Sequence, residues 1–295
     1  MNSTLIVGCG FLGRRVGKLL NESGHQVFGT TRTAEHAPDL VACGVEPVIA
    51  NVLDPDTLKA LPLVDRVLYC VGFDRTAGIP MRTVYVDGLQ NVLTHLKGNP
   101  RLIYASSTGV YARDDGGWVD EDYPAEPCHE AGKVCLEAEQ VATASHLQST
   151  VLRFAGLYGP DRVMRRASLI AGEPVIGDPA KWLNVIHIDD AARVAVAALD
   201  HEHTDKLFVV SDNRPVQRSE FYAIAARCLG ASPPEFVLPE PGSPEARREE
   251  SNKRVSNQRM KQQLLADLTY PDIVTGLPQA LGYVDSIAIA PIPSD

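Results

Sequence analysis

The chain has 295 residues, 44% hydrophobic and 22% charged, which is the composition of a globular protein with a full core. Its net charge of −9 argues against nucleic acid or an anionic membrane as the main partner, although a small anion can still bind locally. The opening MNSTLIVGCG lacks the basic start of a signal peptide, and no run approaches the roughly 20 apolar residues of a spanning helix. We therefore expect a cytoplasmic protein with no membrane association.

Six cysteines are scattered along the chain, at positions 9, 43, 70, 128, 135 and 228. They form no CxxC pair and no cluster flanked by histidines. This pattern is typical of reduced thiols in a cytoplasmic protein. It predicts no structural zinc and no other metal site.

The first two-thirds of the chain alternates short apolar runs with stretches of helical spacing. The expected strands are 4–8, 25–31, 46–52, 65–71, 101–107 and 149–154. The expected helices are 13–23, 34–43, 55–60, 81–97 and 129–147. Apolar runs without alternation are buried on both faces, which implies a parallel sheet covered by helices. The sequence predicts an α/β fold with a doubly wound parallel sheet of the Rossmann type.

The alternation of strand-like and helix-like segments ends after about residue 157, where glycine, proline and arginine become frequent. Further strands are expected at 183–188 and 206–212, with helices beginning at Asp189 and near residue 218. Residues 231–257 are rich in proline and then charged, which indicates a surface excursion. We expect residues 1–160, with the elements around 184–212, to form a large first domain. Residues 161–183 and 213–295 would form a smaller cap interleaved with it.

The segment VGCGFLG places Gly8, Gly10 and Gly13 in G-x-G-x-x-G spacing between the first strand and the first helix. Glycine serves there for the tight turn, for close approach of the backbone to a pyrophosphate, and for helix–strand packing. The pyrophosphate then lies at a helix N-terminus, where free N–H groups favour negative charge. The sequence therefore predicts a dinucleotide site. Other expected cofactor contacts are Phe11, Leu12, Asn51, Val52, Val71 and Phe154.

The end of the second strand indicates which dinucleotide binds. NAD sites usually carry an acidic residue there, which holds the ribose 2′-hydroxyl. This strand ends FGTTRT, so that Thr31 and Arg32 occupy the position, and Glu35 is the nearest acid. A guanidinium suits a 2′-phosphate. We expect NADP in preference to NAD, with an arginine on an exposed loop as the simpler interpretation of Arg32.

Several segments in order resemble the extended short-chain dehydrogenase/reductases, the NAD(P)-dependent epimerase/dehydratase family. They are GCGFLG, ASSTGVY (105–111), LRFAGLYGP (152–160) and NVIHIDDAARVAVAAL (184–199). The resemblance implies that Ser107, after the fifth strand, binds the reacting oxygen. It also implies a Tyr-x-x-x-Lys pair that supplies an acid/base phenol and a lysine for the nicotinamide ribose. Lys133 matches the lysine, but His129 stands at the tyrosine position.

This departure leaves the catalytic assignment open. Imidazole can give or take a proton near neutral pH, so His129 is one candidate acid/base group. The alternative is a partly exposed helix residue in a protein that has lost the tyrosine. Tyr85 stands where the family has asparagine in an Asn-x-x-Gly segment, and it is a candidate for a displaced phenol or for simple aromatic packing.

Two functions compete at this level. The first is an NADP-dependent oxidoreductase or epimerase/dehydratase that acts on a sugar-like or small carbonyl or alcohol substrate, with Ser107, His129 and Lys133 at the catalytic centre. Arg162, Arg165 and Arg166 would then face the substrate cleft and bind a phosphate or a nucleotide-diphosphate group, as in a nucleotide sugar; a solvated basic loop is the alternative interpretation of these arginines. The second is a non-catalytic NADP(H)-binding sensor or regulatory module. The resemblance also implies a possible homodimer through the helices at 81–97 and 129–147.

Overall fold

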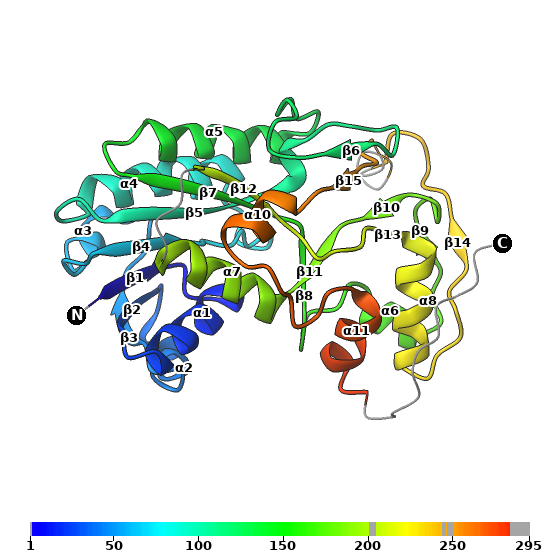
Figure 1. Cartoon of the computed structure of the whole chain (residues 1–295), viewed down its shortest axis with the longest axis horizontal. Coiled ribbons are helices and arrows are strands. Elements are labelled where there is room, and N and C mark those ends of the chain that lie inside the picture. The colour runs from blue at the N-terminus through cyan, green and yellow to red at the C-terminus, as the bar shows by residue number, and fades with distance from the viewer. Residues whose placement is uncertain (1, 201–204, 244–245, 247–249, 284–295) are drawn as a thin grey trace.

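The computed structural model describes residues 2–200, 205–243, 246 and 250–283 (Figure 1). A seven-stranded parallel sheet forms the centre of the larger part, in the order β12-β7-β5-β4-β1-β2-β3. Its strands are β1 (Ser3–Val7), β2 (Gln26–Thr31), β3 (Glu46–Ile49), β4 (Arg66–Tyr69), β5 (Arg101–Ser107), β7 (Ser149–Phe154) and β12 (Leu207–Val210). The predicted doubly wound parallel sheet is confirmed.

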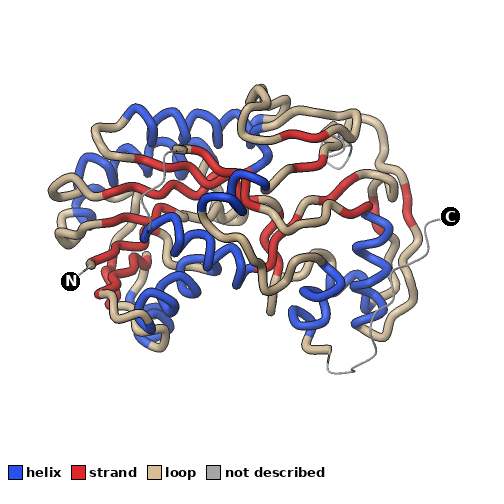
Figure 2. Tube along the Cα trace, in the orientation of Figure 1, coloured by secondary structure: helices blue, strands red, loops and turns tan. Residues whose placement is uncertain are grey.

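Helices cover both faces of this sheet, as Figure 2 shows. One layer holds α1 (Phe11–Glu22) and α7 (Ile188–Asp200), and the other holds α4 (Gly88–His95) and α5 (Glu130–Ala144). Successive residues of one strand serve the two layers: Ile6 packs with α1 and α7, whereas Leu5 packs with α4 and α5. This two-sided burial is the reason why the strands are continuous apolar runs.

Shorter helices complete the layers. They are η1 (Ala34–His36), α2 (Ala37–Val41), α3 (Pro55–Leu58), η2 (Thr83–Asp87) and η3 (Thr108–Val110). The stretch η2 is π-helical and runs directly into α4. Such insertions are rare and occur frequently at functional sites.

The strand order reverses between β1 and β4, because β2 and β3 extend the sheet on one side and β5, β7 and β12 on the other. Ligands of open α/β sheets bind outside the carboxyl ends of the strands at this point. The chain passes there through Gly8, directly after β1, and Val71, shortly after β4.

A second cluster of elements lies beside the sheet, at the right of Figure 1. It contains α6 (Arg166–Ile170), α8 (Arg218–Cys228), α11 (Ile273–Leu281), and the strand pairs β8 (Gly156–Tyr158) with β11 (Val185–His187), β9 (Val175–Ile176) with β14 (Phe236–Val237), and β10 (Trp182–Leu183) with β13 (Val216–Gln217). Its core includes the buried rings of Tyr158 and Phe221. The elements of this cluster come from segments before, within and after residues 184–212. None of the helices in the part of the chain described here combines the length and apolarity needed to cross a membrane.

The expectation of a surface excursion at 231–257 is wrong for its last residues. There β15 (Arg254–Val255) pairs in parallel with β6 (Trp118–Val119), and α10 (Gln258–Gln263) follows. Val255 is 1% exposed and the Lys253 ammonium is buried as well. The charged residues Lys253 and Arg254 therefore pack against distant parts of the chain, because Lys253 Nζ donates to the carbonyl of Tyr111 and Arg254 donates to the carbonyls of Gly116 and Gly117. Residues 244–245 and 247–249 of this stretch lie outside the described residues.

Candidate functional site

A cavity of about 470 Å³ opens at the carboxyl ends of the strands where their order reverses. Gly8 and Gly10 form its floor together with Val71. Gly8 has φ +84°, and a Cβ placed on it would lie 2.6 Å from the Cα of Val71. Its N–H donates to the hydroxyl of Thr30 over 2.9 Å. Only glycine fits here, because any side chain would meet backbone.

The third glycine of the motif serves packing. A Cβ on Gly13 would lie 2.8 Å from a methyl group of Ile6, so its absence lets α1 sit close on β1. The first turn of α1 then points its free N–H groups toward the carboxyl edge of the sheet. The glycine floor and this helix terminus fit a dinucleotide pyrophosphate. The sheet, its reversal point and the glycine-lined cavity define a dinucleotide-binding protein of the Rossmann type.

Polar side chains line the rim of the cavity beyond β2. They are Thr31, Arg32, Thr33, His36, Arg14, Asp39 and Asp74. Both arginines have an acidic neighbour among them: Arg14 lies 3.3 Å from Asp39, and Arg32 lies 3.9 Å from Asp74. Arg32 is 66% exposed, so neither its charge nor its donors are committed to a buried partner. The sequence interpretation missed Arg14, His36 and Asp74, because the turns that carry them approach one another only in the tertiary structure.

The remaining predicted cofactor residues divide into two groups. Val52 and Val71 line the cavity, whereas Phe11, Leu12, Gly13, Asn51 and Phe154 are not part of its lining. Leu12 and Phe154 are buried in the core between α1, α7 and the sheet. The Asn51 side chain accepts a hydrogen bond from the N–H of Leu53 and shapes the turn after β3. The Phe11 ring lies beneath two guanidiniums, those of Arg15 at 4.5 Å and Arg162 at 5.1 Å.

Lys133 lies away from this cavity. Its side chain is exposed and lines a separate shallow hollow with Pro127, Glu137 and Gln140. On the same helix Cys135 faces inward and packs in a cluster that Tyr85 covers. Lys133 is therefore absent from the lining of the cavity, and its contact with the nicotinamide ribose stays a prediction.

Tyr85 is half-buried in the π-helical stretch η2, beside the cavity. Its ring meets that of Phe73 edge to face, with centroids 6.2 Å apart, and Phe73 stands between two residues of the cavity lining, Gly72 and Asp74. Burial raises the pKa of the Tyr85 phenol, while a backbone hydrogen bond from Phe73 and the charges of Arg75 and Arg162 act in the opposite direction. The raised pKa keeps this phenol protonated near neutral pH.

Ser106 and Ser107 end β5, and their hydroxyls have different partners. Ser107 accepts a hydrogen bond from the N–H of Gly109 over 3.1 Å and thereby caps η3. Ser106 donates to the carboxylate of Glu139 over 2.5 Å. Glu139 also holds the guanidinium of Arg153, and both side chains are 6% exposed. This buried network fixes the end of β5 against α5.

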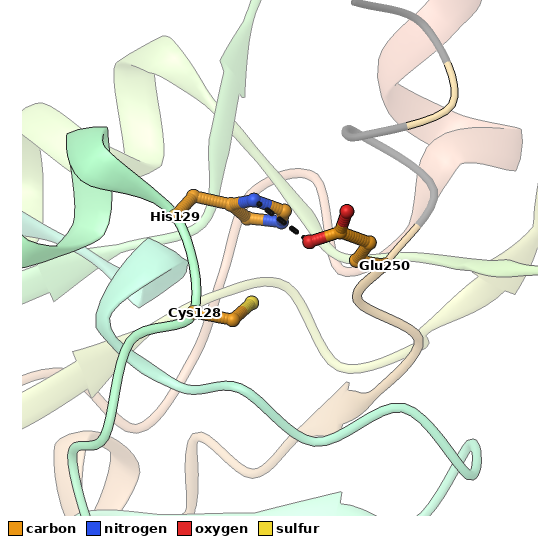
Figure 3. Close-up of side chains that lie close together, drawn as sticks. All are labelled: Cys128, His129 and Glu250. Carbon is orange, nitrogen blue, oxygen red and sulfur yellow. Dashed lines mark ion pairs between the residues drawn. The ribbon is translucent and has the colours of Figure 1, made fainter. Parts of the chain in front are cut away.

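His129 immediately precedes α5, and its carbonyl accepts the helical hydrogen bond from the N–H of Lys133. Its ring points across to the C-terminal segment, where Nδ1 lies 3.4 Å from Oε2 of Glu250 (Figure 3). The other ring nitrogen, Nε2, is buried and has no hydrogen-bond partner among the described residues. His129 is not part of the cavity lining.

Comparison with known proteins agrees with this geometry. Residues 8–202 match the model of the NAD(P)H-binding family. The chain belongs to this family and to the extended short-chain dehydrogenase/reductases. Among curated relatives, it is 28% identical to Protein YeeZ of Escherichia coli over 80% of this chain and 87% of that protein. It is also 28% identical to the short-chain dehydrogenase/reductase family 42E member 1 of Mus musculus, over 79% of this chain and 68% of that one.

Solved structures give the same result. A protein from Methylobacillus flagellatus, provisionally named an NAD-dependent epimerase/dehydratase, is 33% identical and has a TM-score of 0.73 over 95% of this chain and 98% of its own. UDP-glucuronic acid 4-epimerase of Bacillus cereus, solved with UDP-glucuronic acid and NAD, has a TM-score of 0.79 over 95% of this chain and 98% of its own. At 20% identity the second likeness concerns the fold alone.

Proposed function

We propose that this protein is an NADP-dependent oxidoreductase of the epimerase/dehydratase type, acting on a small carbonyl or alcohol substrate. The observation that carries the preference for NADP is the rim beyond β2, where Arg14, Arg32 and His36 line the cavity. The ion pairs of both arginines are partly exposed, and such pairs contribute only about 0–1 kcal/mol. A 2′-phosphate can therefore replace the carboxylates as the partner of these guanidiniums at a small cost in free energy.

The test compares two cofactors on one variant. Charge-assisted hydrogen bonds contribute about 1.5–3 kcal/mol, so Arg32→Ala should weaken NADPH binding by roughly ten- to a hundredfold and leave NADH binding nearly unchanged. Fluorescence titration measures both affinities. Arg227→Ala, on the exposed side of α8, is the matched control and should change neither. An equal loss for both cofactors would refute the 2′-phosphate role of Arg32.

A bound nicotinamide supplies hydride chemistry, and the chain must then supply a proton at the substrate oxygen. Tyr85 is the group that we favour for this role, because its phenol lies next to the cavity loop at Phe73 and near the charge of Arg162. His129 as acid/base group and Ser107 as the residue that holds the oxygen stay predictions from the family resemblance.

Single-turnover oxidation of NADPH separates these proton donors. Tyr85→Phe should slow turnover by roughly a hundredfold or more while leaving NADPH affinity unchanged, since a positioned acid typically contributes 10²–10⁴-fold. His129→Ala, measured alongside, should have the smaller effect. Parent-rate turnover by Tyr85→Phe would exclude the phenol, and a large loss only in His129→Ala would return the role to the imidazole.

A nucleotide sugar is the substrate class that we would test first. Arg162 lies over the Phe11 ring at the sheet reversal, and Arg165 and Arg166 follow it at the start of α6. Guanidiniums so placed suit a diphosphate. The structural neighbour from Bacillus cereus holds UDP-glucuronic acid, which supports this choice. A panel of nucleotide sugars and simple carbonyls, followed by NADPH oxidation, tests it.

The alternative function is a non-catalytic NADP(H)-binding module. The exposed position of Lys133 and the replacement of the expected tyrosine by His129 favour it. Tight NADPH binding with no turnover of any substrate in the panel would select this alternative. A homodimer through α4 and α5, which the resemblance implies, is a separate proposal that sedimentation of the purified chain tests.

A further inference from the structure

Three side chains of different chemistry meet outside the cofactor cavity, and Figure 3 shows them together. Cys128 and His129 come from the loop that enters α5, whereas Glu250 comes from the C-terminal segment before β15. One donor atom from each lies within 4.8 Å of the other two. The tertiary structure alone brings them together, because Glu250 is far along the chain from the other two.

The donor set matches the preferences of a divalent transition metal ion. Zn²⁺ binds thiolate, imidazole and carboxylate ligands, and tetrahedral coordination at their usual bond lengths places neighbouring donors about 3.3–3.7 Å apart. The separation of 3.4 Å between His129 Nδ1 and Glu250 Oε2 already falls in this range. Cys128 and Glu250 are both exposed, so small rotations of their side chains can close the remaining distances.

A second observation concerns His129 itself. Its Nδ1 faces the carboxylate, but Nε2 is buried with no hydrogen-bond partner among the described residues. Buried polar atoms in proteins are normally satisfied, and one that is not calls for an explanation. Coordination through Nδ1 would leave the proton on Nε2, so a metal ion accounts for the orientation of the ring toward Glu250 and not for the unpartnered Nε2.

The charges also balance. A coordinated thiol is deprotonated, so Cys128 and Glu250 together would carry two negative charges against a dication. Lys253 is the nearest buried cation on this segment, and its ammonium is already occupied by the carbonyl of Tyr111 at 2.8 Å and the hydroxyl of Ser251 at 2.7 Å.

We propose that Cys128, His129 and Glu250 bind a divalent transition metal ion of the Zn²⁺ class, with a fourth coordination position open to solvent or a ligand. The site joins the C-terminal segment to the beginning of α5. It goes beyond the cofactor function proposed above and does not require it. In the metal-bound protein His129 is a ligand and not a proton donor.

Co²⁺ is the probe for the test, because a thiolate ligand gives it charge-transfer absorption in the near ultraviolet. The full-length chain, without a histidine tag, is stripped with a chelator, exchanged into chelator-free buffer and titrated with Co²⁺ in the absence of cofactor. We expect one equivalent to bind with a charge-transfer band that excess Zn²⁺ removes. Cys128→Ser should abolish the band, and Glu250→Gln and His129→Ala should each weaken binding by about tenfold or more.

Matched controls are Cys43→Ser, on the other side of the protein fold, and Glu130→Gln, adjacent in sequence to the cluster; both should bind Co²⁺ as the parent does. Circular dichroism and urea unfolding of every variant show whether it has folded, independently of the metal and of the cofactor, and NADPH titration is measured separately. The proposal is overturned if no thiolate band forms in the parent, or if the band survives in folded Cys128→Ser. Failure of NADPH binding would count against the proposed function and leave this result unaffected.

Discussion

Lys253 is a buried ammonium whose two side-chain hydrogen bonds go to neutral acceptors, and it makes the stability of this protein depend on pH. It is 9% exposed, and its Nζ donates to the carbonyl of Tyr111 and the hydroxyl of Ser251. Burial lowers the pKa of Lys253 from 10.5 to about 8, partly opposed by Cys128. Below pH 8 both the folded and the unfolded chain hold this proton, so the desolvation cost of the charge is fully present.

Between pH 8 and 10.5 the unfolded chain binds more protons at this residue than the folded chain does, so stability rises with pH. The shift of 2.5 pKa units corresponds to about 3 kcal/mol, at 1.36 kcal/mol per unit. Replacing Lys253 by methionine removes this dependence. The free energy of unfolding of the parent, minus that of Lys253→Met, should therefore increase by about 3 kcal/mol across this range.

Urea unfolding at a series of pH values, with a chelator present, measures the difference. Lys18→Met, at a site where the side chain is 64% exposed, is the matched control for removing a lysine from the surface. A parent-minus-variant difference that stays constant from about pH 7 to pH 10.5 would refute the reasoning. It would mean that water reaches the ammonium of Lys253 in the folded protein.

Two further predictions concern the buried network and the glycine floor. Glu139→Gln leaves the guanidinium of Arg153 buried without its counter-charge and should lower the free energy of unfolding, measured with urea, by about 3–5 kcal/mol. The control Glu137→Gln, on the exposed side of α5, should lower it by at most about 1 kcal/mol. Similar losses for both variants would contradict a buried ion pair between Glu139 and Arg153. Gly8→Ala meets backbone 2.6 Å away at φ +84° and should abolish NADPH binding by titration, whereas Gly24→Ala, at φ +80° in open space, should leave binding intact. Retained NADPH binding in Gly8→Ala would show that the backbone at Val71 can move to accommodate the added Cβ.

The sequence predicted the sheet and its helices because their signals are local. Uninterrupted apolar runs such as 102–104 require burial on both faces, and that requirement leads directly to a parallel sheet between helix layers. The glycine motif could also be identified from the sequence, because Gly8 and Gly13 are needed for contacts within a single βαβ unit. Thr31 and Arg32, the residues that end the second strand, were predicted at the cavity for the same reason.

The tertiary structure decided what depends on packing between distant segments. A four-residue spacing places His129 and Lys133 on neighbouring turns, but only the seating of α5 on the sheet determines that Lys133 faces solvent and Cys135 faces inward. Likewise, the charged residues within 250–255 predict a surface segment when the sequence alone is considered. Its pairing with β6 buries Lys253 and brings Glu250 to His129, because backbone hydrogen bonds between distant strands outweigh the local preference of charged residues for water.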